Sequence, residues 1–365
     1  MGVLRVILAL IIVFEHAGYL QSFHWMSGVY SLKIFFIMSG FYMTFVLDRK
    51  YVGKGSYSLF LSNRFLRLYP IYLAVLGATF GVGILSYLVY NDWQVITPYV
   101  MYHDVMGIGP LIFQIFTNIF IFGQDLVLFL GLDLHSGSLF FTSDFRLTDP
   151  PYYIFLFVPH AWSLGIELWY YLVAPYLARR KTKVILLFIT ITLLLRWYLY
   201  SIGLTHDPWN YRFFPLELVF FFIGTLSYRL YCYIEKNEIN KNIRISIVSI
   251  FFIMFFSYNY LFSFAIESYW VPIFFFAYVG FTIPFLFQFS KKSKIDYRLG
   301  ELSYPIYVVH IVVIKTLSLL MEKYNWQFSR GLAVLIITII LSYLLLKLVS
   351  DPVEKFRQSR VKTIK

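Results

Sequence analysis

Ten long apolar segments run along this chain, and they constrain its fold more than any other feature. A helix needs about 20 predominantly apolar residues to cross a bilayer. The composition agrees, with 59% hydrophobic residues, 14% charged residues and a mean hydropathy of +0.70, a balance that soluble domains do not show. We therefore predict an all-α polytopic membrane protein. The expected spans are residues 4–20, 29–47, 69–90, 160–178, 184–200, 213–232, 245–264, 270–289, 302–320 and 331–349.

Basic residues are concentrated in alternate connecting segments. Of the 31 Lys and Arg, 21 lie in the segments 48–68, 179–183, 233–244, 290–301 and 350–365. The connections on the other side hold only Arg146, Arg212, Lys323 and Arg330. The positive-inside rule then places both termini and the basic segments in the cytoplasm. On this interpretation the net charge of +12 reports orientation, and no nucleic-acid partner is expected.

Residues 111–131 do not fit this topology as a span. An eleventh span here would move the basic segment 179–183 to the outer side. We therefore expect a re-entrant or interfacial helix within one outer excursion, 91–159. The chain is predicted to form a single transmembrane domain, 1–350, followed by a basic cytoplasmic tail, 351–365.

The first apolar segment carries two ionisable groups that a bilayer disfavours. An arginine at the centre of a membrane helix costs about 3 kcal/mol, so such a residue is a functional candidate. Arg5 and His16 are eleven residues apart, which places them on one helix face about 16 Å from each other. Glu15 points about 100° away from His16 and is not expected to pair with it.

Two short motifs follow, and each has a structural alternative. Arg64 and Arg67 share a face if their segment is helical, and paired guanidinium groups suit phosphate, although lipid headgroups are an equally simple ligand. Ser39 and Gly40 lie inside the second span, where close helix packing explains a small pair.

The fourth span begins with PHAWSLGIELWYY, which holds His160, Trp162, Ser163 and Glu167. His160, Ser163 and Glu167 fall close to one helix face. A carboxylate buried in a membrane needs a partner. Glu167 is therefore either half of a structural ion pair, with Arg196 or Arg229, or a group that takes part in a reaction.

The ninth span places Ser303, Tyr307 and His310 on one face at spacings of four and three. A single histidine in such a position is commonly a hydrogen-bonded packing residue. Glu217 in the sixth span is predicted to be structural or to line the outer mouth. Cys232 is the only cysteine, so neither an intrachain disulfide nor a cysteine metal site is possible, and no metal is expected.

Five of these stretches resemble motifs of the integral-membrane acyltransferase 3 family. RVILALIIVFEH is similar to its arginine-x10-histidine motif, IFFIMSGF to its FF-x-x-SGF segment and RFLR to its RxxR motif. HAWSLGIELWYY and LGELSYPIYVVH resemble its WSL-x-x-E and LG-x-x-SY-x-x-Y-x-x-H segments. The five fall in the family's order. The ending SDPVEKFRQSR departs from the family's acid-arginine-proline-phenylalanine pattern, which puts the role of Glu354 in doubt.

The resemblance implies acyl transfer, usually of acetyl, from cytoplasmic acyl-coenzyme A to a hydroxyl of a surface polysaccharide or a lipid-linked glycan precursor. It also implies the inner membrane of a bacterium. Arg5, Arg64 and Arg67 are expected to hold the donor phosphates. His16 is expected to be the general base, because its pKa lies near working pH. Glu167 is the second catalytic candidate, as a group that orients the imidazole or binds the sugar.

The supporting and acceptor-binding candidates are Glu15, Ser39, Trp162, Ser163, Tyr307 and His310. An acyl-enzyme on His16 or on a serine, Ser39, Ser163 or Ser303, remains open beside direct transfer. The competing classes are a transporter or flippase of lipid-linked sugars and a scaffold subunit. Carriers commonly show internal repeats, and this sequence has none.

Overall fold

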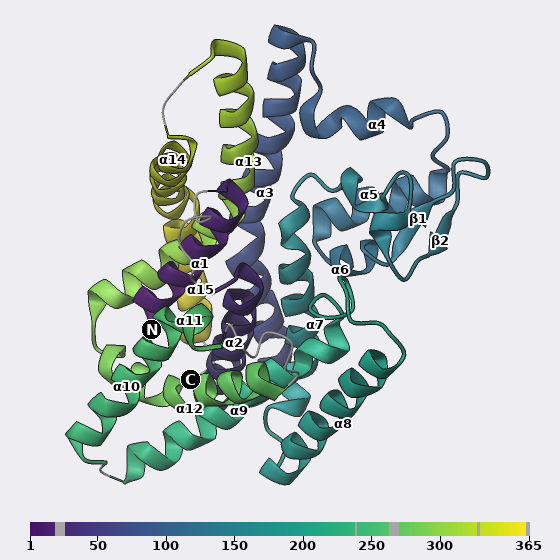
Figure 1. The fold of residues 1–365 in the computed structure, drawn as a ribbon. Helices are drawn as coiled ribbons and strands as arrows, with labels where there is room; N and C mark the ends of the chain where they lie inside the picture. The colour runs from purple at the N-terminus through teal and green to yellow at the C-terminus, as the bar shows by residue number, and fades with distance from the viewer. Residues whose placement is uncertain (19–25, 238, 263–269, 327–328, 363–365) are drawn as a thin grey trace.

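The computed structural model describes residues 1–18, 26–237, 239–262, 270–326 and 329–362, and they are almost entirely helical (Figure 1). The helices are α1 (Gly2–Ala17), α2 (Gly28–Arg49), α3 (Ser56–Tyr90), α4 (Thr97–Met101), α5 (Ile108–Phe120), α6 (Gln124–Val127), α7 (Trp162–Leu177), α8 (Thr182–Ser201), α9 (Phe214–Lys236), α10 (Lys241–Phe256), α11 (Tyr258–Phe262), α12 (Trp270–Ser290), α13 (Lys294–Tyr324), α14 (Arg330–Leu345) and α15 (Asp351–Lys362). The two strands are β1 (Leu130–Leu132) and β2 (Leu139–Phe141).

Each predicted span overlaps a helix, although 245–264 is divided between α10 and α11. Residues 19–20 and 263–264 of two predicted spans lie outside the described residues. The all-α polytopic class is confirmed. Seven helical stretches of the described chain are long and apolar enough to cross a membrane. They are α2, α3, α8, α9, Pro272–Ser290 within α12, α13 and Arg330–Val361, which runs from α14 into α15. Helices α1, α7 and α10 have 16 residues each, fewer than a perpendicular crossing requires. The number ten stays a prediction.

Two helices begin well before the predicted boundaries. Helix α3 starts at Ser56 rather than at residue 69, with Pro70 inside it, and α13 starts at Lys294 rather than at residue 302. Proline is tolerated within membrane helices because neighbouring groups satisfy the freed carbonyl. The arginine pair of RFLR therefore lies on a regular helix.

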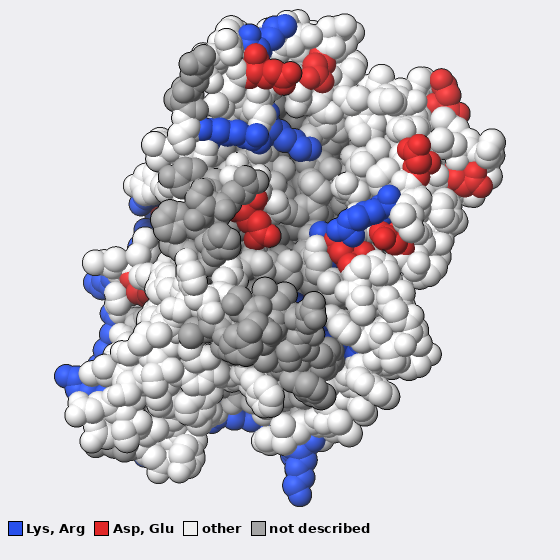
Figure 2. Space-filling view, viewed as in Figure 1, with Lys and Arg blue, Asp and Glu red and all other residues white. Residues whose placement is uncertain are grey.

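The five basic segments lie on one face of the molecule, which we call the basic face. Arg179 donates to the Leu47 carbonyl at 2.8 Å, Arg49 pairs with Glu235, and Arg298 pairs with Asp351 at 2.7 Å. Figure 2 shows Lys and Arg along the lower edge of the molecule and most of the visible acidic residues in its upper part. The compartment that this face meets stays a prediction.

Close backbone packing holds the centre of the bundle together. A Cβ added to Gly40 would lie 2.0 Å from the Phe221 carbonyl oxygen, and one on Gly224 would lie 2.0 Å from that of Ile37. Helices α2 and α9 therefore touch along their backbones, as the small pair at Ser39 and Gly40 suggests. Helix α1 packs along α13.

The outer excursion forms a lobe beside α3 and α7 that contains α4, α5, α6 and the β1–β2 hairpin (Figure 1). The strands pair antiparallel, with Gly131 opposite Phe140. Segment 111–131 is not one continuous span, because α5 ends at Phe120 and the chain turns there. The Tyr69 hydroxyl donates to the Phe120 carbonyl, which seats the end of α5 against α3.

Candidate active site

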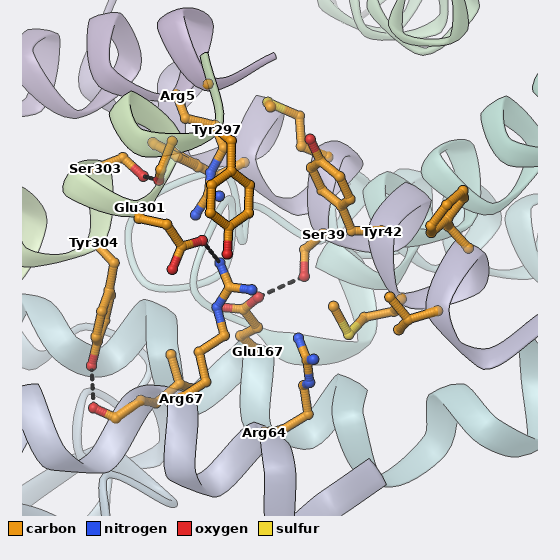
Figure 3. Close-up of a pocket in the computed structure, with 18 of the residues that line it drawn as sticks. Arg5, Ser39, Tyr42, Arg64, Arg67, Glu167, Tyr297, Glu301, Ser303 and Tyr304 are labelled. Atoms are coloured by element: carbon orange, nitrogen blue, oxygen red, sulfur yellow. Dashed lines mark hydrogen bonds and ion pairs between the residues drawn. The ribbon is translucent and has the colours of Figure 1, made fainter. Parts of the chain in front are cut away.

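A cavity of about 480 Å³ lies inside the bundle at the basic face. Lys50 and Lys291, from two basic segments, are part of its lining. Eight candidate site residues from the sequence also line it: Arg5, Ser39, Arg64, Arg67, Ser163, Glu167, Ser303 and Tyr307. They come from α1, α2, α3, α7 and α13, so the fold gathers residues from the whole length of the sequence into one site (Figure 3).

Arg5 and His16 face α13 at two levels, as their eleven-residue spacing predicts. A Cβ on Gly300 would lie 3.7 Å from Arg5 Nη1, and His16 Nδ1 lies 3.0 Å from His310 Nε2. The start of α1 is fixed by Asp296, whose carboxylate accepts from the Met1 amino group at 3.1 Å. Arg5 therefore lines the cavity from its α1 side.

Arg64 and Arg67 extend from neighbouring turns of α3 into the cavity (Figure 3). Arg67 lies 3.6 Å from the Glu301 carboxylate. Arg64 is only 5% exposed, and no hydrogen bond or ion pair reaches it from the described residues. A guanidinium so buried does not contact lipid headgroups. The charge of Arg64 therefore lies at the wall of the cavity.

Glu167 accepts two hydrogen bonds at the cavity wall. The hydroxyls of Ser39 and Tyr171 both donate to its Oε1 at 2.6 Å. The ion pair with Arg196 or Arg229, one of the two alternatives for Glu167, does not form. Arg196 pairs with Glu217 at 2.9 Å, and Arg229 donates to Thr182 and to the Arg180 carbonyl. Glu217 is fully buried, so it is a structural residue and does not line an outer mouth.

Ser163 and Tyr307 lie together in the cavity lining, one turn of α13 before His310. The Tyr307 hydroxyl donates to the His160 carbonyl at 2.6 Å, so the Ser163 hydroxyl must be the donor in its own 2.6 Å contact with Tyr307. Ser303 likewise donates to the Gly300 carbonyl at 2.7 Å. Of the three candidate serines, only Ser39 donates to a carboxylate.

His16 and His310 form a dyad whose tautomers follow from its partners. His310 Nδ1 lies 2.6 Å from the Tyr307 carbonyl oxygen, which can only accept, so this nitrogen carries the proton. His310 Nε2 then has a lone pair, and His16 Nδ1 must donate to it. This arrangement leaves the His16 Nε2 lone pair available to take a proton. His310 is fully buried, whereas His16 is exposed.

The dyad does not belong to the cavity lining, although the layout of the first helix suggests that an acyl group would arrive at His16. Ser303 and Tyr307 of α13 line the cavity, and His310 follows about 4.5 Å further along the helix axis. His160 packs beside it, with ring centroids 4.7 Å apart, and donates to the Val308 carbonyl at 3.0 Å. The dyad therefore lies one helical turn beyond the Tyr307 end of the cavity.

Trp162 belongs to a separate network in the connections opposite the basic face, which we call the Asp207 network. Arg212 lies 4.5 Å from the Trp162 ring and donates to Asp207 at 2.6 Å. Arg146 and the Tyr211 hydroxyl donate to the same carboxylate at 2.7 and 2.8 Å. Burial raises the pKa of the Tyr211 phenol, which keeps it a neutral donor.

Glu15, predicted to point away from His16, accepts from the Gly28 backbone N–H instead. This bond links the end of α1 to the start of α2. Glu15 therefore supports the position of His16 through the backbone, and within the described residues it makes no hydrogen bond to the imidazole.

Sequence reasoning missed several residues of the cavity, chiefly Glu301, Tyr171 and Arg357, and it left the role of Glu354 in doubt. Glu301 lies within the quoted LGELSY stretch, and a carboxylate so close to an apolar span was a usable signal. Tyr171 follows Glu167 at i+4, the spacing at which helical side chains meet. Nothing local predicts Glu354 and Arg357, because their helix reaches the cavity only through the tertiary fold.

These features define a class: a polytopic membrane protein with an arginine-lined cavity at its basic face and a histidine dyad beyond the cavity's end. Residues 1–347 match the acyltransferase domain of the acyltransferase 3 family. The chain belongs to this family and is a membrane acyltransferase.

A relative from Aquifex aeolicus (strain VF5), an uncharacterized protein, is 27% identical over 217 residues. The matched region covers 58% of this chain and 92% of that protein. No solved structure matches the chain.

Proposed function

We propose that this protein is an O-acyltransferase of a bacterial inner membrane that uses acyl-coenzyme A, with acetyl the expected group, to acylate a glycan hydroxyl. The acceptor is a surface polysaccharide or its lipid-linked precursor. One observation carries the proposal: a single cavity joins three arginines at the basic face to the turn of α13 that precedes the histidine dyad.

The donor fits this cavity by shape and charge. Coenzyme A carries phosphates at one end and a long thin arm with the thioester at the other. Guanidinium groups bind phosphate oxygens through paired N–H donors. With the phosphates on Arg5, Arg64 and Arg67, the arm extends toward Ser163 and Tyr307, and the thioester approaches the dyad.

His16 Nε2 then acts as the general base. It takes the proton of the acceptor hydroxyl while the oxygen attacks the thioester carbonyl carbon. The C–S bond breaks, the coenzyme A thiolate leaves, and the proton held by His16 is available to neutralise it. A positioned base contributes about 10²- to 10⁴-fold to such a reaction. His310 is a positioning residue, because its Nε2 accepts from His16 and holds the ring in the productive tautomer.

For the alternative route through an acyl-enzyme, Ser39 is the best candidate among the three serines for the nucleophile that would carry the acyl group. Ser39 donates to the Glu167 carboxylate at 2.6 Å, the arrangement in which a base activates a hydroxyl. In that route Glu167 takes the Ser39 proton while the serine oxygen attacks the thioester carbonyl carbon, the C–S bond breaks, and coenzyme A leaves with that proton. In a second step the acceptor hydroxyl attacks the serine ester, Glu167 takes its proton, and the proton passes to the Ser39 oxygen as the ester bond breaks.

The test is acyl-coenzyme A turnover by the purified chain in nanodiscs, with and without a glycan acceptor. We expect His16→Ala to lower kcat by 10² or more and His310→Asn to lower it by about tenfold with an altered pH profile, both at unchanged donor KM. Ser39→Ala abolishes transfer only if the acyl-enzyme forms. Wild-type protein that neither binds nor turns over the donor would contradict the proposal and favour a carrier.

A further inference from the structure

Helix α15 folds back under the cavity and is held at both ends. Near its start, Asp351 pairs with Arg298 of the segment that opens α13, at 2.7 Å. Toward its end, Arg360 donates to Asn63 Oδ1 of α3 at 3.0 Å. Residues 351–362 of the predicted cytoplasmic tail therefore form a helix that lies against the site. It lies outside residues 1–347, the region that matches the family.

Three residues of α15 line the cavity: Glu354, Arg357 and Gln358. Arg357 is only 6% exposed, comparable with Arg64 at 5%. Within the described chain, the buried Nε atoms of both arginines have no hydrogen-bond partner. Two guanidinium groups from helices far apart in sequence thus line one cavity, and each has a buried Nε donor without a partner in the described chain.

Such an arrangement is unfavourable in the absence of an anion. A buried donor without a partner costs about 1–3 kcal/mol, and like charges repel in a site of low dielectric. Arg357 is balanced by Glu354, three residues earlier on the same helix, and Arg67 by Glu301. Arg64 has no carboxylate partner among the described residues.

The charges of the whole cavity also favour an anionic ligand. Its lining has six Lys or Arg and four Asp or Glu. Two of the four acids are already engaged, Asp296 by the Met1 amino group and Glu167 by two hydroxyls. The remaining two pair with arginine, Glu301 with Arg67 and Glu354 with Arg357, and Glu354 also accepts from Gln358 of its own helix. A phosphate that replaced Glu354 beside Arg357 would lie in the cavity that Arg64 also lines.

We propose that Arg357 is a further guanidinium of the donor-phosphate site and that Glu354 is its resident counterion, displaced when a phosphate binds. The inference rests on the proposed function and deepens it, because it assigns α15 to donor binding. Arg357 changes partner, from the carboxylate of its own helix to the ligand. Glu354 therefore competes with the donor for the same guanidinium.

The experiment measures equilibrium binding of coenzyme A to the full chain in nanodiscs, with pantetheine as a probe that has the arm but no phosphate. Arg357→Ala should weaken coenzyme A binding about tenfold or more and leave pantetheine binding unchanged. Lys355→Ala is the matched control, because it removes the same charge from an exposed position of α15. It should change binding less than twofold. Glu354→Gln should tighten binding several-fold.

Arg357→Lys, which keeps the charge without the planar fork, guards against a variant that fails to fold, and it should show an intermediate loss. Arg357→Ala that binds coenzyme A like Lys355→Ala would overturn the inference while the proposed function stands. Glu354→Gln that weakens binding as Arg357→Ala does would also overturn it, since the pair would then be structural. Wild-type protein that binds no coenzyme A would overturn both proposals.

Discussion

The cavity at the basic face and the Asp207 network use the same residue types in opposite ways. Around Asp207, one carboxylate accepts from Arg146, Tyr211 and Arg212, and the Arg212 guanidinium also lies 4.5 Å from the centre of the Trp162 ring. In the cavity, donors of Arg64 and Arg357 remain unused.

The difference separates charge that stabilises the fold from charge that is available to a ligand. Where every arginine donor already has a hydrogen-bond partner, substitution of an arginine should lower the stability of the fold. Where arginine donors lack partners, a bound ligand can supply them, so substitution of an arginine should lower the affinity for that ligand. Arginine content alone does not distinguish the two regions.

The largest effect that separates the regions is expected from Arg64→Ala combined with Arg67→Ala. Loss of two phosphate contacts should raise donor KM about 10- to 100-fold with a smaller change in kcat, because binding rather than chemistry is lost. Steady-state kinetics of acyl-coenzyme A turnover checks this. Arg146→Ala is the control, as an arginine of the saturated network, and a comparable rise in its donor KM would break the comparison.

Asp207→Asn should have the opposite profile. The substitution removes the negative charge with which both Arg146 and Arg212 pair, and this loss should destabilise the protein by about 1–3 kcal/mol. Thermal unfolding in detergent measures the loss, and donor KM should stay unchanged. A variant as stable as wild type would show that the network is not a structural element.

The smallest effect is expected at a satisfied position within the cavity. Tyr171→Phe removes one of the two hydroxyls that donate to Glu167 and should lower stability by about 1 kcal/mol without changing donor KM. Tyr198→Phe, at an exposed tyrosine of α8, supplies the matched control for thermal unfolding. A donor KM raised by Tyr171→Phe alone would mean that this satisfied hydroxyl also binds the donor.

Helical periodicity predicted much of the site, because its residues lie on regular helices. The eleven-residue spacing of Arg5 and His16 placed both on one face of their helix, and the structure shows that this face meets α13. The spacings among Ser303, Tyr307 and His310 placed all three on one face. The interpretation of 111–131 as something other than a span agrees with the turn after Phe120.

Helical periodicity could not predict which side chains from different helices pair with one another. Arg196 forms its ion pair with Glu217 rather than with Glu167, and His16 hydrogen-bonds to His310, which is 294 residues away. Such choices depend on which helices become neighbours, and no local pattern contains that information. The position of α15 at the cavity could not be predicted from its sequence for the same reason, because this sequence equally suits a helix on the membrane surface.

The direction of the hydrogen bonds in the dyad limits where a proton taken up at His16 can go. His16 is exposed, and a proton would reach the cavity from it only through a continuous chain of donors and acceptors. The chain from His16 through His310 ends at the Tyr307 backbone carbonyl, which holds no proton to pass on. The dyad therefore does not conduct protons from His16 into the cavity, and a proton taken up at His16 leaves again from His16.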